Sequence, residues 1–260
     1  MSRVEWNGAS GAYPEREVLP VMILIRKRAL WALALCGCSV LGMASVLWAG
    51  LTTQPVFAPA ERSPVVWIID PGHGGEDGGA VSESGVQESG INLAVSLRLR
   101  EILRFTGQQT RMTREADVSI CDEGLPSIRA RKASDIRNRV TLVNETPGAV
   151  LVSIHQNSLP ASPETHGAQA FWNTQTGGEA LAGAVQEVLN ITINTHRAKN
   201  PRQIPQTIYL MNHVTAPAIL VECGFLSNPA ETALLGSPDY QTKLAAVIAA
   251  GCLRAGEETP

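Results

Sequence analysis

The stretch that decides the fold is residues 65–79, VVWIIDPGHGGEDGG. Its first five residues are apolar and mostly β-branched, which predicts a buried strand that ends near Asp70. The five glycines that follow surround one histidine, His73, in a loop at the carboxyl end of that strand. Ligands of α/β sheets gather at this end of the strands, so the loop is the first candidate for a catalytic site.

The residues after this loop continue the pattern of an α/β fold. Apolar residues recur every three or four positions through 91–105, which predicts a helix with one apolar face. Gly107 follows as a stop signal, and a short strand is expected at 109–112. A strand, a helix and a second strand in this order predict a parallel sheet covered by helices.

The rest of the chain supplies further elements of the same two kinds. Helices are expected at 134–144, 179–195 and 240–253, and strands at 149–154, 168–172, 207–210 and 218–221. No internal repeat is visible, and no second domain fits after these elements are placed. The prediction is an α/β fold: a single domain over 65–255, with a mixed, mostly parallel sheet flanked by helices.

Composition excludes several classes of protein. The chain has 260 residues, of which 44% are hydrophobic and 17% charged, so it is neither disordered nor collagen-like. Its 21 basic and 24 acidic residues give a net charge of −3, which supplies no positive field for nucleic acid. The five cysteines have no spacing typical of a disulfide scaffold or a zinc ribbon.

The N-terminal part contains a run of 23 uncharged, mostly apolar residues, 29–51. As a helix this run would reach about 34 Å, enough to cross a hydrocarbon layer of about 30 Å. Basic residues precede it at 26–28, so the positive-inside rule predicts a cytoplasmic segment 1–28, a transmembrane anchor 29–51 and an extracytoplasmic remainder. Three prolines lie within 52–64, which predicts a linker. The natural start of the chain is either Met1 or Met22.

Two other interpretations of this segment stay open. It could be a signal peptide that is cleaved after 56–58, although its apolar run is longer than such peptides usually have. Residues 35–38 have a weak likeness to a lipoprotein box, but an apolar stretch follows where a polar tether is expected.

Three ionisable side chains stand at the ends of three predicted strands. His73 follows the first, His155 the second and Glu222 the third. Charged carboxylates are rarely buried unless they are paired or bound to a metal ion, so Glu222 requires a partner. Glu88 is a fourth candidate, although a carboxylate at a helix start is also favoured by the helix dipole.

Two histidines and one carboxylate form a recognised catalytic zinc set, with a further carboxylate free to act as a base. The side chains of such a site are present here as His73, Glu88, His155 and Glu222. Their scattered spacing alone does not prove that they converge. A phosphate-binding loop is a weaker interpretation of the glycines, because no Lys-Ser or Lys-Thr follows them. Asn157 is a candidate substrate contact, since its amide can hydrogen-bond a glycan or a peptide without titrating.

Several motifs carry a resemblance to a known family. The sequence is similar to the zinc-dependent N-acetylmuramoyl-L-alanine amidases over about 65–253, in DPGHGG (70–75), the helix of Glu88, MTR (112–114), SIHQN (153–157) and VECGFLSNP (221–229). Within that family it most resembles the CwlD-type germination amidases of endospore formers, in GAQAF (167–171), RAK (197–199), IYLM (208–211) and LLGSPDY (234–240).

The resemblance implies a reaction and a residue for each step. His73, Glu88 and His155 would bind Zn²⁺, and Glu222 would be the general base. The bond broken would join N-acetylmuramic acid to L-alanine of the stem peptide in peptidoglycan. In the CwlD-type branch this step prepares muramic-δ-lactam in spore cortex, and an accessory sporulation protein is a further expected partner.

Alternatives to this interpretation remain. The chain could be a catalytically silent peptidoglycan-binding or regulatory relative, although all four site residues are present. A zinc peptidase or deacetylase would use the same metal set. The arginines of 129–139 are expected on a solvated helix face, with binding of the stem-peptide carboxylates as the alternative. His213 could approach the cleft, and Cys223 is expected to be a core residue.

Overall fold

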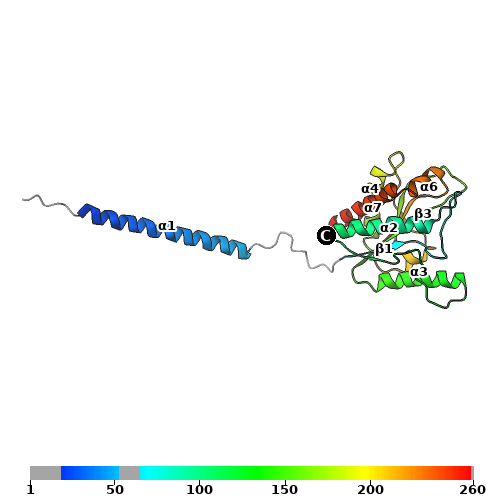
Figure 1. Ribbon diagram of the computed structural model, residues 1–260, viewed down its shortest axis with the longest axis horizontal. Helices are drawn as coiled ribbons and strands as arrows, with labels where there is room; N and C mark the ends of the chain where they lie inside the picture. Colours follow the sequence, from blue (N-terminus) through cyan, green and yellow to red (C-terminus); the bar gives the residue numbers. More distant parts are fainter. Residues whose placement is uncertain (1–18, 53–64, 259–260) are drawn as a thin grey trace, which may run out of the picture. The chain divides into compact units, whose positions relative to one another are not determined.

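The structure, a computed structural model, describes residues 19–52 and 65–258. These residues belong to two units, one within 1–61 and one within 62–260 (Figure 1). The first unit contains helix α1 (Leu19–Thr52), whose side chains are described over 29–45 and are exposed.

Within the part of the chain that the structure describes, no helix combines the length and the hydropathy of a membrane span. The predicted anchor at 29–51 continues beyond the side chains described for α1, and it stays a prediction. Residues 1–18 of the predicted cytoplasmic segment and 53–64 of the predicted linker lie outside the described residues.

The second unit is built on a six-stranded sheet with the order β2-β1-β3-β6-β4-β5. Its strands are β1 (Val66–Pro71), β2 (Gln109–Met112), β3 (Ala149–Asn157), β4 (Gln169–Trp172), β5 (Arg202–Gln203) and β6 (Ala218–Phe225). The first four strands in that order are mutually parallel, and β4 runs antiparallel to β6. The predicted mixed, mostly parallel sheet is therefore confirmed.

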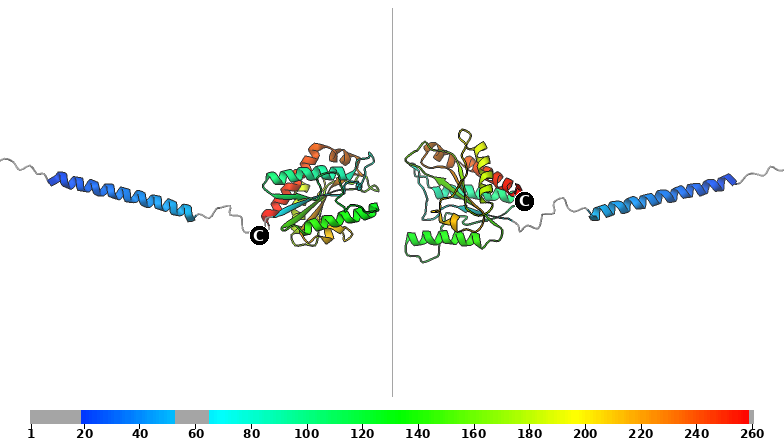
Figure 2. Two further views of the ribbon diagram at one scale, coloured as in Figure 1. Left: turned by 60° about the horizontal axis from the view of Figure 1, so that its bottom comes forward. Right: turned by 180° about the vertical axis from the view of Figure 1, so that it is seen from behind.

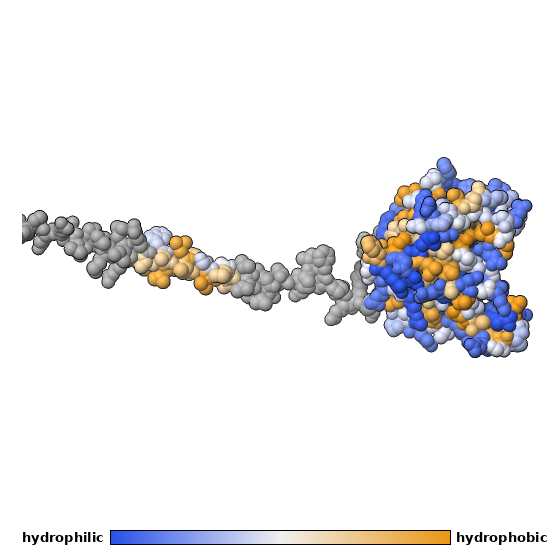
Figure 3. All heavy atoms as spheres, viewed as in Figure 1, coloured by the Kyte–Doolittle hydropathy of each residue, from blue (hydrophilic) through white to orange (hydrophobic). Residues whose placement is uncertain are grey.

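Helices cover both faces of this sheet (Figure 1, Figure 2). One face packs against α2 (Glu88–Phe105), α4 (Gly178–Thr192) and α7 (Pro238–Glu258), and the other against α3 (Ile128–Asn144) and α5 (Tyr209–His213). The short helix α6 (Pro229–Leu235) follows β6. In the space-filling view, hydrophobic side chains on the visible face of this unit are interspersed with hydrophilic ones, as is usual for the surface of a folded domain (Figure 3).

Strand alternation explains why two helical layers are needed. In β1, Trp67 and Ile69 point into the core under α2, whereas Ile68 points into the core under α3. The same alternation occurs in β3, where Val152 and Leu151 join different cores. Because successive side chains of a strand point to opposite faces, apolar runs in central strands are buried on both sides.

Some boundaries differ from the sequence predictions for identifiable reasons. Residues 207–210, expected as a strand, instead lead into helix α5, whose Leu210 and Met211 are both buried. A short apolar run does not distinguish a strand from a buried helix by periodicity alone. Helix α3 begins at Ile128 rather than at 134, because the Ser127 side chain caps it by accepting a hydrogen bond from the Ala130 N–H.

One arginine of the 129–139 run is not on a solvated face. Arg139 is 2% exposed, and its Nη1 lies 2.6 Å from Asp70 Oδ1 while its Nε lies 2.7 Å from Asp135 Oδ2. Asp70 also accepts hydrogen bonds from Thr113 and Ser153. Burial alone would raise the pKa of Asp70, but the Arg139 charge and these two hydroxyls lower it. The expected solvated face is wrong at this position.

We predict that Arg139→Met destabilises the fold strongly, because it leaves the Asp70 carboxylate buried without its charged partner. The expected loss is about 3–5 kcal/mol in the free energy of unfolding, measured by urea denaturation. Arg137→Met, at an exposed position on the same helix, is the matched control and should change stability by less than about 0.5 kcal/mol. Equal losses in the two variants would contradict a structural role specific to Arg139.

Candidate metal centre

The loop after β1 carries His73 in an unusual backbone conformation. Among the described residues, His73 is the only non-glycine with a positive φ, 61°. Two buried arginines hold the loop around it: Arg139 donates to the carbonyls of Pro71 and His73, and Arg114 donates to those of Pro71 and Gly72. Left-handed backbone costs a non-glycine residue about 1–2 kcal/mol, and such strain persists at functional sites where neighbours fix it.

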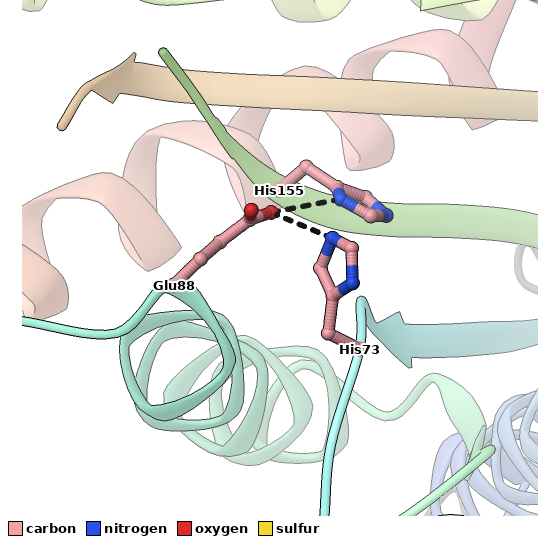
Figure 4. Close-up of side chains that lie close together, drawn as sticks. All are labelled: His73, Glu88 and His155. Atoms are coloured by element: carbon pink, nitrogen blue, oxygen red, sulfur yellow. Dashed lines mark hydrogen bonds and ion pairs between the residues drawn. The ribbon is translucent and has the colours of Figure 1, made fainter. Parts of the chain in front are cut away.

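Three side chains from three elements meet at this loop (Figure 4). Glu88 begins α2, and its Oε1 lies 3.3 Å from His73 Nε2 and 2.9 Å from His155 Nδ1. His155 belongs to β3, next to β1 in the sheet. One ligand atom of each residue lies within 4.8 Å of the other two. The sequence-predicted ligand set is therefore brought together in one cluster.

The loop glycines make room for these side chains. A Cβ atom on Gly72 would lie 2.3 Å from His155 Cε1, and one on Gly79 would lie 2.5 Å from Glu88 Oε2 and 2.7 Å from His73 Cδ2. Real Cβ atoms essentially never approach other atoms so closely. Two of the five glycines are thus explained by contact with the site's own residues.

Buried polar groups fix the orientation of Glu88. Its Oε2 accepts a hydrogen bond from the Ala80 N–H at 2.9 Å. Its Oε1 accepts from the Asn92 amide and from the Gln156 N–H, both at 3.1 Å. Asn92 is fully buried and also donates to the Gly72 carbonyl, so it links the carboxylate to the histidine loop.

The charges of the cluster are strongly coupled. Burial disfavours the charged form of His73, but hydrogen bonds and ion pairs with Glu88 and Asp77 outweigh it and raise the pKa of His73 to about 9. Burial would likewise raise the pKa of Glu88, yet the two histidines hold it far below its usual range. Positive charge is thus stabilised between these side chains. Two imidazole nitrogens and a carboxylate oxygen at this spacing fit the donor set of a catalytic zinc site.

Glu222 lies beside the cluster on β6, in register with His155 of β3. Its Oε2 is buried and has no hydrogen-bond partner among the described residues. Burial raises the pKa of Glu222 to about 7, despite the lowering effect of the His155 charge. A buried carboxylate oxygen without a partner is costly, which indicates that a bound ligand or water completes its contacts.

His73, His155 and Glu222 open into one cleft of about 610 Å³. Ile136 on α3 and Tyr209 on α5 contribute to its apolar wall. The polar part of its lining includes Glu76, Asp77, Asp117, Arg131, Lys132 and Asp135. A cleft with an apolar wall and a few convergent polar groups is typical of a binding site for an extended ligand.

Other candidates from the sequence lie elsewhere. Asn157 ends β3 outside the residues that line the cleft, and its Oδ1 accepts a hydrogen bond from the Ser158 N–H. His213 is exposed and stacks on Tyr209, with ring centroids 3.7 Å apart, and it does not line the cleft either. Cys223 is buried in the core, as expected.

Sequence reasoning missed the residues that support the ligands. Four residues hold the histidine loop or a ligand in place: Arg114, Arg139, Asn92 and Asp77. Arg114 belongs to a motif that carried the family resemblance, and Asp77 lies within the glycine-rich loop, so both could have been selected from the sequence.

Known proteins resemble this chain in sequence and in fold. The germination-specific N-acetylmuramoyl-L-alanine amidase of Bacillus subtilis is 42% identical over 189 residues, covering 72% of this chain and 77% of that protein. The structure of the CwlD amidase from Clostridioides difficile, in complex with the GerS lipoprotein, matches with a TM-score of 0.71 and 32% identity, over 74% of this chain and 98% of that one.

Two further matches extend the comparison. The catalytic domain of CwlV from Bacillus (Paenibacillus) polymyxa, an N-acetylmuramoyl-L-alanine amidase, matches with a TM-score of 0.62 and 27% identity, over 74% of this chain and 98% of that one. The family model described as N-acetylmuramoyl-L-alanine amidase matches residues 68–254, nearly the whole second unit. The chain therefore belongs to the N-acetylmuramoyl-L-alanine amidase family.

Proposed function

We propose that this amidase hydrolyses the amide between N-acetylmuramic acid and L-alanine of the peptidoglycan stem peptide, with Zn²⁺ held by His73, Glu88 and His155. The observation that carries the proposal is the meeting of these three ligand atoms beside a buried oxygen of Glu222 to which no described residue donates a hydrogen bond. Membership of the family supports the choice of bond.

The residues of the cluster fit zinc because of their chemistry and their charge. His73 offers Nε2, since its Nδ1 faces Asp77, and His155 offers Nδ1. Glu88 contributes Oε1, which Asn92 and the Gln156 N–H already orient. When bound, the metal supplies Lewis acidity, which polarises the scissile carbonyl and lowers the pKa of water toward neutrality.

Glu222 would then move protons. Its carboxylate would take a proton from the attacking water and deliver that proton to the nitrogen of the leaving L-alanine. A raised pKa suits both halves of this role, because the group accepts and releases a proton near neutrality. The cleft beside it would accept the glycan and the stem peptide. A contact with Asn157 is also proposed, for the part of the substrate that extends past the residues lining this cleft.

We also propose the biological context of the reaction. The germination-specific relative from Bacillus subtilis supports a role in forming muramic-δ-lactam in spore cortex. The Clostridioides relative was solved with a lipoprotein, which supports an accessory protein as a partner here. A cell wall substrate requires an extracytoplasmic catalytic unit, and the apolar run at 29–51 is the proposed anchor that holds it at the membrane.

The reaction can be tested by product analysis. The purified full-length chain is expected to release stem peptides that begin with L-alanine from peptidoglycan, and a chelator should abolish the release, with recovery after zinc is added. Mass spectrometry of the products from spore and vegetative wall would check this and would report the preferred glycan. Release of acetate, or cuts within the peptide, would instead identify a deacetylase or a peptidase.

Substituting the proposed general base and substituting a proposed metal ligand should have different effects on turnover and on zinc binding. Glu222→Gln is expected to lower kcat by at least about 100-fold while zinc affinity changes little, because the carboxylate moves protons and binds no metal. His155→Ala should lose both zinc and turnover. Glu179→Gln, at an exposed position on α4, is the control that should keep both. Full turnover by Glu222→Gln would reject the general-base assignment.

The glycine loop gives a third test of the metal centre. Gly79→Ala should abolish zinc binding, measured by metal analysis after dialysis, because its Cβ would collide with Glu88 and His73. Gly85→Ala is matched for backbone strain, since Gly85 has φ of +84° and Gly79 of +70°, but its Cβ would meet open space. We expect Gly85→Ala to keep its zinc, and a similar loss in both variants would show that strain alone is responsible.

A further inference from the structure

Two adjacent ion pairs join the histidine loop to helix α3. Arg131 donates to Glu76 Oε2 through Nη2 at 2.8 Å and Nε at 3.0 Å. Lys132 Nζ lies 2.8 Å from Asp77 Oδ1. Only the second pair reaches a proposed metal ligand, because Asp77 Oδ2 lies 2.9 Å from His73 Nδ1.

We propose that Asp77, oriented by Lys132, is a positioning residue that keeps the proton of His73 on Nδ1 and leaves Nε2 free to bind the metal. The inference rests on the zinc site proposed above. His73 Nε2 faces Glu88 Oε1 at 3.3 Å, so this nitrogen is the one on the metal side of the ring. A ligating nitrogen carries no proton, and the hydrogen bond at the other nitrogen selects the tautomer.

The contacts of Asp77 divide between its two oxygens. Lys132 Nζ and the Gly79 N–H, the latter at 3.3 Å, both donate to Oδ1, whereas Oδ2 faces the imidazole. The Oδ1 position therefore requires an acceptor. An asparagine at 77 would turn its carbonyl oxygen toward Lys132 and its NH₂ group toward His73 Nδ1. That NH₂ group would require a proton-free Nδ1, which places the His73 proton on Nε2 and blocks the metal.

This arrangement predicts a specific pattern of zinc affinities. In the full-length chain, Asp77→Asn should weaken zinc binding by about 10- to 100-fold, the usual effect of losing such a supporting contact. Adding Lys132→Met to Asp77→Asn should recover affinity by at least about threefold, because only the weaker of the two donors, the Gly79 N–H at 3.3 Å, then opposes turning the amide oxygen toward His73. Glu76→Gln breaks the neighbouring ion pair without touching His73 and should bind zinc as the wild type does.

The experiment is a competition for zinc between each variant and a chromophoric chelator, with the melting temperature of each zinc-free protein measured alongside. Weak binding confined to Asp77→Asn, with recovery in the double variant and little change in melting temperature, would support the positioning role. Wild-type affinity in Asp77→Asn, equal weakening in Glu76→Gln, or no recovery in the double variant would overturn it. A wild type that binds no zinc would instead overturn the proposed metal centre itself.

Discussion

The buried ion pair between Asp70 and Arg139 is the interaction on which the rest of the site depends. It joins the last residues of β1 to α3, and the same guanidinium holds the carbonyls of Pro71 and His73. Breaking such a pair by removing one partner leaves an uncompensated charge in the interior, which is far more costly than losing an exposed ion pair. These contacts maintain the left-handed conformation of His73. Arg139 therefore contributes both to the stability of the fold and to the geometry of the site.

The topology of the sheet explains how distant residues meet. β1, β3 and β6 are parallel neighbours, so their carboxyl ends lie at one edge and carry His73, His155 and Glu222 to the same place. Glu88 does not belong to the sheet; it lies at the start of helix α2, which packs on β1 and β3. The glycines around His73 allow these groups to approach, because any side chain at Gly72 or Gly79 would occupy the space of a ligand.

Much of this arrangement was predictable from sequence, and the exceptions have physical reasons. Runs such as 65–69 and 218–221 predict central strands, because a strand that is apolar without alternation is one covered on both faces. The convergence of the ligands was predicted from the family motifs, because the spacing of scattered residues does not show that they meet. Arg139 was assigned to a solvated face because an arginine in a basic run usually is solvated, and its partner Asp70 is 69 residues away. Pairing over such a distance leaves no local signal.

Two carboxylates of one chemical type have opposite properties here, and their surroundings account for the difference. Glu88 lies between two imidazoles and three further hydrogen-bond donors, so its charged form is stabilised and its pKa is far below the usual range. Glu222 is half-buried on β6, and its buried Oε2 has no hydrogen-bond partner among the described residues, so its charged form is disfavoured and its pKa is raised to about 7. The first environment suits a fixed anionic ligand and the second suits a group that exchanges protons near neutral pH. Exchanging the two roles would require exchanging the hydrogen-bond donors around each residue, since the side chains themselves are the same.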